Sequence, residues 1–413
     1  MIVLSTETLH RLLGEQGKIY IAYSGGMDSH VLLHCVMTQL SSDLRSRVSA
    51  IHIHHGLSDN AGAWALHCQT ICDGYQIPLF NERVTLDTHQ SLEEQARRKR
   101  YEVFERYLEN GDVLLQGHHA NDQAETLLFR LERGTGWRGI QGIPAQRPLG
   151  LGQLWRPLLT ISRQALTEYA QQQSLHWIED ESNADVRFRR NFLRHQVIEP
   201  WEENDGALMA QVAKSAEFMQ SEGRVIERLI RTTLQAHINE TGGLNLASLP
   251  IDERAFWLSG YLKEQNVSLT QAQLSAVVAM FYGAKDKQPL YQTADYRLVR
   301  FNEHLYVLPE ECSPILGMLV EHVWFDRAYD RIRCSEAVEL KSRPEGECLL
   351  LANGKHRSLK KWLQDQRIPI WWRDHLPYIY QGETLVAIGG LWQRPETTVI
   401  VEWHRNDRLC WPH

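Results

Sequence analysis

A short loop near the start of the chain combines glycine, hydroxyl and acidic residues in a way that suits polyphosphate binding. It reads Ser24-Gly-Gly-Met-Asp-Ser29 and directly follows the apolar run 19–23. Adjacent glycines let the backbone approach an anion, and the first amides of a following helix point toward it. Because an aspartate would repel phosphate unless a divalent cation lay between them, Asp28 indicates Mg²⁺ on a nucleotide. We expect nucleotide contacts from the whole loop, which consists of Ser24, Gly25, Gly26, Met27, Asp28 and Ser29.

A second polar cluster, residues 117–126, follows the apolar run 113–116 and reads GHHANDQAET. Asp122 and Glu125 share one face of the helix that this sequence begins. We expect Asp122 to complete the Mg²⁺ coordination that Asp28 starts, and His118 to line the nucleotide site. Capping and packing at a strand end is the alternative for the two histidines. A zinc site is disfavoured because the cluster lacks supporting cysteines and the H-E-x-x-H spacing.

A parallel sheet would bring both clusters together. The runs 19–23, 48–53, 79–84 and 113–116 have the length and composition of buried strands, and amphipathic segments separate them. Alternation of strand and helix predicts an α/β, Rossmann-like domain whose sheet is covered on both faces. Ligands bind such sheets beyond the carboxyl ends of the strands. Both polar clusters follow strands, as this rule requires.

The rest of the chain changes character twice. Residues 207–237 and 250–283 have long helical patterns, and from about residue 315 β-type alternation with many Trp and Tyr residues takes over. A chain of 413 residues also exceeds the size of one hydrophobic core. We therefore predict a catalytic domain over residues 1–203, a helical domain over 204–312 and a small α+β domain over 313–413.

Charge and cysteine content limit the possible partners and location. The formal net charge of −7 argues against non-specific nucleic-acid binding over the whole surface. Residues 341–373, however, hold eight basic and three acidic side chains, a local excess that suits a polyanionic partner. Seven scattered cysteines favour a reducing compartment, and we expect Cys68 and Cys72 to be a core-facing helical pair. Since no window has the roughly 20 apolar residues of a membrane span, we expect a cytoplasmic protein.

Several motifs resemble those of one enzyme family. The loop S-G-G-x-D-S resembles the pyrophosphate loop of the N-type ATP pyrophosphatases, whereas a Walker-type P-loop is absent. H-H-x-x-D-Q-x-E-T, from His118, resembles the second signature of the tRNA(Ile)-lysidine synthetases, and H-H-G-L-S, from His54, resembles another of their elements. Near the carboxyl end, S-L-K-K-W-L and I-P-x-W-x-R-D-x-L-P resemble the last domain of the longer members.

The resemblance implies a ligase that forms a carbon–nitrogen bond. Members use ATP to adenylate C2 of the wobble cytidine (position 34) in tRNA(Ile) with a CAU anticodon, and then join L-lysine to form lysidine. AMP and pyrophosphate are released, and codon reading changes from AUG to AUA. ATP and Mg²⁺ are the implied cofactors, while the tRNA and L-lysine are the implied partners. We also expect a homodimer and no association with a membrane.

The resemblance also implies roles for individual residues. Asp28 and Asp122 correspond to a catalytic acidic pair, and His54 is expected to line the nucleotide pocket. Residues 94–101 resemble an arginine-containing element of the family, which makes Arg97 and Arg100 candidates to hold phosphate or substrate. Asn191 and Arg194 are placed beside the active centre, where an arginine would stabilise developing charge. The catalytic residues expected are Asp28, Asp122, Arg97 and Arg194; those expected to contact substrate or tRNA are Arg100, Glu125, Asn191, Lys360, Lys361 and Arg373.

Two other functions fit parts of the sequence. A tRNA 2-thiolation enzyme of the same superfamily would have the same nucleotide loop, but the 2-thiocytidine synthetases carry C-x-x-C pairs and this chain has none. A tRNA-binding or nucleotide-sensing protein without catalysis would not need the acidic pair. Either Asp122 or Glu125 is expected to accept the proton of the lysine amine, whose reference pKa is about 10.4.

Overall fold

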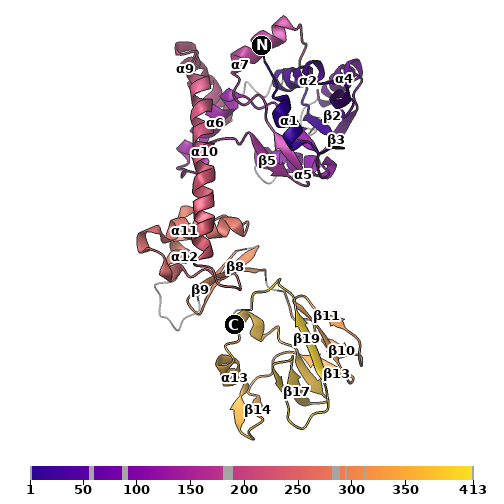
Figure 1. Cartoon of the computed structure of the whole chain (residues 1–413), viewed down its shortest axis with the longest axis vertical. Helices are drawn as coiled ribbons and strands as arrows, with labels where there is room; N and C mark the ends of the chain where they lie inside the picture. The colour runs from indigo at the N-terminus through magenta and orange to yellow at the C-terminus, as the bar shows by residue number, and fades with distance from the viewer. Residues whose placement is uncertain are drawn as a thin grey trace. The chain divides into compact units, whose positions relative to one another are not determined.

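The computed structural model describes residues 2–54, 60–85, 92–179, 189–280, 289–293, 295–310 and 312–411, with side chains from residue 95 in the third range. It divides into two compact units, Met1–Val225 and Ile226–His413 (Figure 1). The division falls within the long helix α10 (Leu208–Gln235). The division into three domains at residues 203 and 312 stays a prediction. No helix in the described part of the chain is long and apolar enough to cross a membrane.

Unit 1 contains the predicted sheet. Its strands are β1 (Ile19–Ala22), β2 (Val48–His54), β3 (Leu79–Arg83), β4 (Val113–Leu115), β5 (Gln146–Leu149) and β6 (Gly152–Trp155), in the order β3-β2-β1-β4-β6-β5. All neighbours pair in parallel except β5 and β6, which form an antiparallel hairpin at the edge. The four strands predicted from the sequence are confirmed, and the edge hairpin was missed.

Helices cover both faces of this sheet. They are α1 (Thr6–Leu12), α2 (Met27–Gln39), α3 (Ser42–Arg45), α4 (Ala61–Tyr75), α5 (Leu92–Tyr107), α6 (Ala120–Glu132) and α7 (Arg163–Gln172). Ile19 and Ile21 pack with α2, α4 and α7 on one face, while Tyr20 packs with α5 on the other, as strand alternation requires. Cys68 and Cys72 are buried in the first of these cores, which confirms their predicted packing role.

The strand order creates a crevice at the carboxyl edge of the sheet. The chain places β2 and β3 on one side of β1 and then returns to place β4 on the other side. The connections that leave β1 and β4 therefore diverge, and a ligand is expected between them. The loop of residues 24–29 follows β1, and residues 117–122 follow β4, so this crevice lies between the two polar clusters of the sequence.

Shorter elements complete unit 1. They are the 3₁₀ turn η1 (Gly139–Gln141), α8 (Arg189–Leu193), the π-helical turn η3 (Arg194–Ile198) and α9 (Glu199–Asn204). Ala120 and Ala124 of α6 pack against Ile198 of η3 and against Met209 and Ala213 of α10. Small residues at this contact bring the backbone of α6 close to α8 and η3, which carry Arg189, Arg190 and Arg194.

Unit 2 begins with the rest of α10, followed by η4 (Leu246–Ser248), η5 (Ile251–Glu253), α11 (Arg254–Glu264) and α12 (Gln271–Met280). These helices were predicted, but the three-stranded sheet β7 (Leu290–Gln292), β8 (Tyr296–Phe301) and β9 (His304–Pro309) was missed. The β8–β9 turn places Asn302 and Glu303 at positive φ. Glu303 stands where glycine marks most such turns, so the usual hairpin signal was lacking.

The end of unit 2 is rich in strands, as predicted. One sheet has the order β10-β13-β16-β17-β18, another has the order β11-β12-β19, and β14 pairs with β15. The elements are β10 (Gly317–Leu319), β11 (Phe325–Asp326), β12 (Asp330–Cys334), β13 (Val338–Lys341), β14 (Cys348–Leu350), β15 (His356–Ser358), α13 (Leu359–Asp365), α14 (Ile370–Arg373), β16 (Tyr378–Gln381), β17 (Thr384–Ile388), β18 (Trp392–Gln393) and β19 (Val401–Arg405).

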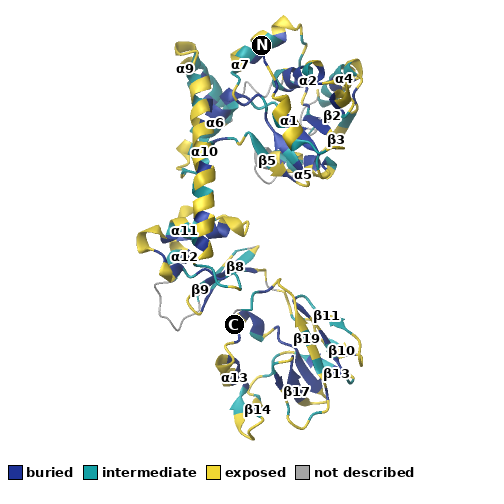
Figure 2. Ribbon diagram, in the orientation of Figure 1, coloured by how far each residue is buried: buried dark blue, intermediate teal, exposed yellow. Residues whose placement is uncertain are grey.

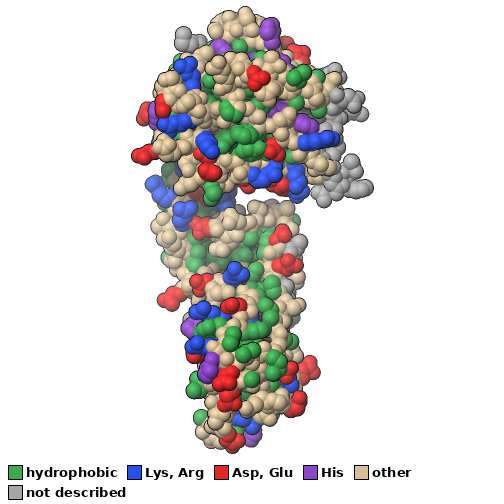
Figure 3. All heavy atoms as spheres, turned by 90° about the vertical axis from the view of Figure 1, so that its right-hand side faces the viewer, with side chains coloured by type: hydrophobic (Ala, Val, Ile, Leu, Met, Phe, Trp, Pro, Cys, Tyr) green, Lys and Arg blue, Asp and Glu red, His purple; other side chains and the backbone are tan. Residues whose placement is uncertain are grey.

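Tryptophans form much of the core of this last region. Trp362, Trp371 and Trp372 are buried, and the indole N–H groups of the last two both donate to the Cys410 carbonyl. These three rings are therefore part of the core. Figure 2 shows burial on central strands such as β17, whereas Figure 3 shows that hydrophobic side chains also reach the surface of unit 2.

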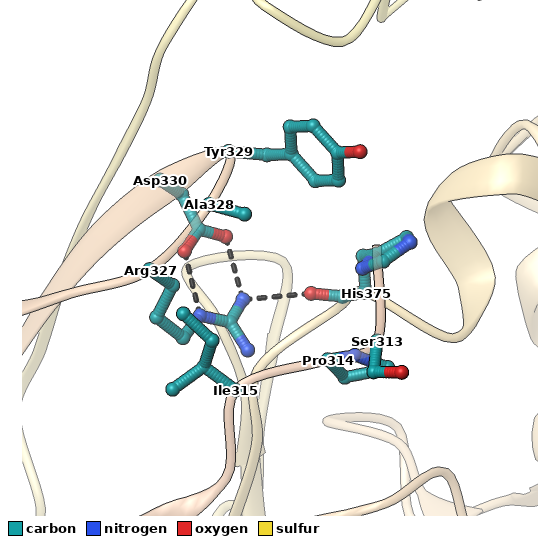
Figure 4. A pocket seen from close by; sticks show the side chains of 8 residues that line it. All are labelled: Ser313, Pro314, Ile315, Arg327, Ala328, Tyr329, Asp330 and His375. Atoms are coloured by element: carbon teal, nitrogen blue, oxygen red, sulfur yellow. Dashed lines mark hydrogen bonds and ion pairs between the residues drawn. The ribbon is translucent and has the colours of Figure 1, made fainter. Parts of the chain in front are cut away.

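A small cavity in unit 2 surrounds a buried ion pair (Figure 4). Both ends of the Arg327 guanidinium donate to Asp330 at 2.6 Å, and one end also donates to the His375 carbonyl at 2.7 Å. Trp403 donates to the same carboxylate at 2.8 Å. Since each buried charge is paired and hydrogen bonded, removal of either partner alone would destabilise the fold.

Candidate active site

The conformation of the loop after β1 is fixed by hydrogen bonds of its own Ser29 hydroxyl group. Ser29 Oγ accepts from the Ser24 backbone N–H at 3.2 Å and donates to the Gly26 carbonyl at 2.9 Å. Gly25 has φ of +84°, and a side chain there would collide with Ile178 and Cys68. The loop therefore requires glycine at this position, both for its backbone conformation and for the close packing around it.

The loop leads directly into α2, whose first amides form a favourable site for an anion. Gly26 is the N-cap of α2 and supplies no side-chain cap. Ser29 Oγ does not cap the helix either, since it bonds the Ser24 backbone N–H and the Gly26 carbonyl within the loop. A helix start without a side-chain cap keeps N–H groups available for phosphate oxygens.

The turn after β4 packs directly onto the start of α2. A Cβ atom at Gly117 would lie 2.9 Å from the Asp28 carbonyl oxygen and 3.2 Å from the Ser29 backbone nitrogen. Only a glycine permits this approach. It brings the two polar clusters of the sequence to one place, from strands that are neighbours in the sheet.

Two carboxylates flank one histidine in this crevice. His119 Nε2 lies 3.6 Å from an oxygen of Asp28 and 3.6 Å from an oxygen of Asp122. The other ring nitrogen, Nδ1, accepts from the Asn121 backbone N–H, so in the neutral ring the proton is on Nε2, facing the carboxylates. His119 also caps α6, and Asp122 accepts from its backbone N–H at 2.9 Å. The capping alternative is thus correct for His119 without separating it from the acidic pair.

Electrostatics keep Asp122 charged. Burial by itself would raise its pKa, but the rings of His119 and His118, the His119 backbone N–H and Arg194 together hold the pKa below its usual value. For His119, burial opposes protonation, yet Asp122 and Asp28 outweigh it and raise the pKa of the ring. The crevice therefore favours a positive group between the two carboxylates.

Arg194 joins this cluster through a second carboxylate on α6. Its Nε donates to Glu125 at 2.6 Å, and its terminal nitrogen lies 3.9 Å from Asp122. Glu125 is 7% exposed, and burial raises its pKa despite the nearby guanidinium. The predicted grouping of Asp28, Asp122, Glu125 and Arg194 thus exists in the structure.

His118 and the arginine-bearing helix α5 form the neighbouring wall. Arg156 donates to His118 Nδ1 at 3.2 Å and to the Tyr101 hydroxyl at 3.1 Å. Burial lowers the pKa of His118 to about 4, so the ring is neutral near pH 7. The Arg97 guanidinium lies 5.2 Å from the Tyr101 ring centre, and both Arg97 and Arg100 are exposed on this helix.

The remaining predicted residues lie at several places. His54 ends β2, beside β1, with its Nδ1 buried and without a partner among the described residues. Asn191 lies on α8. Lys360 and Lys361 are exposed on α13, and Arg373 is half-buried and donates to the Ile368 carbonyl at 3.1 Å. The positive charge of this region is partly offset, because Lys341, Arg343 and Arg357 pair with nearby carboxylates.

Comparison with known proteins gives a consistent relationship along the chain. A PP-loop domain model matches residues 4–200, and a TilS substrate C-terminal domain model matches residues 338–400. The tRNA(Ile)-lysidine synthase of Pseudomonas putida is 37% identical over 400 residues, covering 90% of this chain and 92% of the relative. That of Coxiella burnetii is 33% identical, with 90% and 88% covered, and that of Pectobacterium atrosepticum is 31% identical, with 94% and 95% covered.

The chain belongs to the tRNA(Ile)-lysidine synthase family. A solved structure of a U34-tRNA thiolase from Methanococcus maripaludis with its [4Fe-4S] cluster is a far weaker match. It is 14% identical, covers 52% of this chain and 77% of its own, and has a TM-score of 0.39. The thiolation alternative gains nothing from a likeness this distant.

A divalent cation fits the acidic pair of this lysidine synthase family member. Asp28 Oδ1 is buried and has no hydrogen-bond partner among the described residues, and it belongs to one of the two carboxylates that flank His119. No group of three or more His, Cys, Asp or Glu side chains in the described ranges forms a metal cage. Mg²⁺ needs no such cage, since it takes one or two protein carboxylates and completes its shell with phosphate and water.

Sequence reasoning missed part of the site. Arg156 and Tyr101 were not singled out as site residues, although Tyr101 ends the arginine-containing element. Arg156 is 2% exposed and bonds His118, Tyr101 and the Pro144 carbonyl. A lone arginine just after a strand carries no motif. Residues 55–58, the rest of the H-H-G-L-S element that was predicted to line the nucleotide pocket, lie outside the described residues, as do residues 180–188.

The contact at Gly117 gives a testable consequence. We expect Gly117→Ala to separate the two clusters and to lower turnover by about 100-fold, because a shift near 1 Å is enough for such a loss. Overpacking is expected to cost about 1–3 kcal/mol of stability. Turnover and urea unfolding measure both effects. Gly74→Ala is the control, since a Cβ atom there meets nothing within 4 Å; equal behaviour of the two variants would refute the role of the close contact.

Proposed function

We propose that the protein joins L-lysine to the wobble cytidine of a CAU-anticodon tRNA(Ile) in an ATP-dependent reaction. One observation carries the proposal: Asp28 and Asp122, which follow neighbouring strands, each place a carboxylate oxygen 3.6 Å from His119 Nε2, beside a glycine-rich loop. That arrangement suits a nucleotide whose polyphosphate is neutralised by a cation. Family membership supports the choice of tRNA and amino acid.

The loop and the start of α2 bind the polyphosphate in this proposal. Backbone N–H groups after Gly26 and the hydroxyl of Ser24 donate to phosphate oxygens, while His54 and the neutral His118 line the nucleotide pocket. Mg²⁺, held by Asp28 and Asp122, would supply charge neutralisation where pyrophosphate leaves. Asp122 stays ionised near neutral pH in this role, which agrees with its lowered pKa.

The reaction has two steps. The O2 oxygen of the cytidine attacks the α-phosphorus of ATP, which forms an adenylate and breaks the bond to pyrophosphate. The lysine amine then attacks C2, and the oxygen leaves as part of AMP. Arg194 reaches Asp122 and Glu125, so its guanidinium is placed to stabilise negative charge that develops in both steps.

The attacking amine must lose a proton. Glu125 is the better acceptor of the two predicted carboxylates, because Asp122 is committed to the cation and the pKa of Glu125 is raised by burial. Arg97, at the same wall as His118, is proposed to hold phosphate or substrate, and Arg100, Asn191, Lys360, Lys361 and Arg373 are proposed to contact the tRNA. The reaction takes place in the cytoplasm, where the tRNA, ATP and a reducing environment for seven cysteines are present. A homodimer stays a prediction.

Label transfer tests the proposed function. Purified protein is incubated with Mg-ATP, labelled L-lysine and unmodified CAU-anticodon tRNA(Ile), and label in the RNA is counted together with AMP. We expect one AMP per lysine transferred and no transfer to a tRNA whose wobble base is not cytidine. AMP release without transfer would replace lysine by another nucleophile. Absence of both products would reject the enzyme reading.

A further inference from the structure

A row of arginines runs along α6 away from the acidic pair, on the side against which α8 and η3 pack. The two segments are antiparallel: Arg194 pairs with Glu125 near the start of α6, whereas Arg189 donates to Glu132 at its end, at 3.1 Å. Arginines of α8 and η3 thus contact successive positions along one side of α6, and Arg189 makes the contact that lies farther from the acidic pair.

An aromatic ring in the middle of this row carries two further arginines. The guanidinium of Arg133, the residue after α6, lies 4.0 Å from the centre of the Phe129 ring, and that of Arg190 lies 5.6 Å from it. Arg133 and Arg189 are exposed, and Arg190 is half-buried. Stacking on a ring leaves the N–H groups at the edge of a guanidinium able to reach oxygen acceptors, as for the exposed Arg133.

Positive charge exceeds negative charge along the row. The described contacts of the row involve four arginines, Arg133, Arg189, Arg190 and Arg194, but only two carboxylates, those of Glu125 and Glu132. Arg130 adds another cation: burial, Arg97 and Arg190 lower its pKa, so Arg97 and Arg190 each lie within electrostatic reach of Arg130. Like charges held this close repel, and a polyanion laid against them relieves the repulsion. The protein as a whole is acidic, so this concentration is local.

The length of the row fits a short stretch of nucleic-acid backbone. Eight residues separate Glu125 from Arg133, and at 1.5 Å per residue they span about 12 Å of helix axis. At a rise of about 3.4 Å per stacked nucleotide, that is roughly three to four nucleotides of one strand. We propose that Arg133, Arg189 and Arg190 bind the phosphates of the anticodon arm next to the wobble base, which positions C2 at the acidic pair. This inference rests on the proposed function.

Direct RNA binding tests the phosphate row separately from catalysis. The probe is a fluorescent RNA stem–loop with the CAU anticodon, and its Kd for the full chain is measured at several salt concentrations. Arg133→Gln combined with Arg190→Gln is expected to raise Kd by about tenfold or more and to reduce the slope of log Kd against log salt by about two, one for each phosphate contact. Arg133→Lys keeps the positive charge, so we expect its slope of log Kd against log salt to be close to that of the wild type.

Arg47→Gln is the matched control. Arg47 also pairs with one carboxylate, Asp43 at 2.8 Å, but it precedes β2 and so lies at the amino edge of the sheet, away from the crevice. It should leave both Kd and slope at the wild-type values. The inference is overturned if the Arg133 and Arg190 variant binds RNA like the wild type, or if Arg47→Gln weakens binding equally. Circular dichroism melting checks that each variant is folded.

Lysine transfer then separates the two proposals. With active wild-type protein, the variant should raise KM for tRNA while kcat and the KM values for ATP and lysine stay the same. Unchanged KM for tRNA would overturn the phosphate row and leave the proposed function intact. A wild type that binds the stem–loop through these arginines but transfers no lysine would reject the proposed function instead.

Discussion

Asp122→Asn should abolish lysine transfer, with a loss of about 1,000-fold or more in kcat, while the protein stays folded. Asparagine keeps an oxygen that can accept from the His119 backbone N–H, so the start of α6 remains capped. What it removes is the negative charge that, with Asp28, would hold the cation on the polyphosphate. The measurement is single-turnover transfer of labelled lysine at saturating ATP and tRNA.

The matched control for this variant is Asp73→Asn. Asp73 is an exposed carboxylate on α4 that accepts from Gln69, and it is not part of the crevice. It should transfer lysine at the wild-type rate. Asp28→Asn should reproduce the loss seen with Asp122→Asn, because both carboxylates serve one cation. A folded Asp122→Asn protein that keeps more than about a tenth of the wild-type rate would contradict the role of the pair.

Arg194→Gln is expected to damage both activity and stability. Turnover should fall by about 100- to 1,000-fold, since a positive group beside the reacting atoms is lost. Removal of this guanidinium leaves the buried Glu125 carboxylate without its partner, which should cost about 3 kcal/mol of unfolding free energy at neutral pH. Urea unfolding measures the second effect, and kcat measures the first.

The pH dependence of this variant has a definite sign. Burial already raises the pKa of Glu125, and loss of Arg194 should raise it further. A carboxyl whose folded pKa exceeds its unfolded pKa binds more protons in the folded state, so stability falls as pH rises through that range and recovers as pH is lowered. The deficit of Arg194→Gln should therefore shrink from pH 8 to pH 5. In the double variant Arg194→Gln with Glu125→Gln, the lost stability should return while activity stays low. A stability deficit of Arg194→Gln that does not change with pH would contradict the pairing of Arg194 with Glu125.

Much of the catalytic unit could be predicted because its signals are local. The strands from residues 19, 48, 79 and 113 are continuous apolar runs, and each polar cluster follows one of them. The rule that ligands bind at the carboxyl ends of parallel strands then placed Asp28 near Asp122 without any knowledge of distances. The change to strands in the Trp-rich end was likewise predicted, since β-type alternation is also a local signal.

The parts that were missed depend on contacts between distant residues. Arg156 reaches His118 across 38 positions, and nothing in the neighbouring sequence marks it. Gly117 is significant only because another loop packs on it, which a single glycine after a strand does not reveal. Arg194 was predicted to lie beside the active centre, but the antiparallel alignment of Arg189 and Arg190 with α6 required the fold.

The fate of one oxygen atom tests the central claim most directly. A CAU-anticodon tRNA(Ile) carrying ¹⁸O at C2 of the wobble cytidine is incubated with the protein, Mg-ATP and L-lysine, and the products are analysed by mass spectrometry. Adenylation of this oxygen followed by lysine attack at C2 predicts one ¹⁸O atom in AMP, none in pyrophosphate, and lysine in place of the label in the RNA. Label that stays in the RNA or appears in pyrophosphate would contradict activation of the cytidine as an adenylate in the crevice between Asp28 and Asp122.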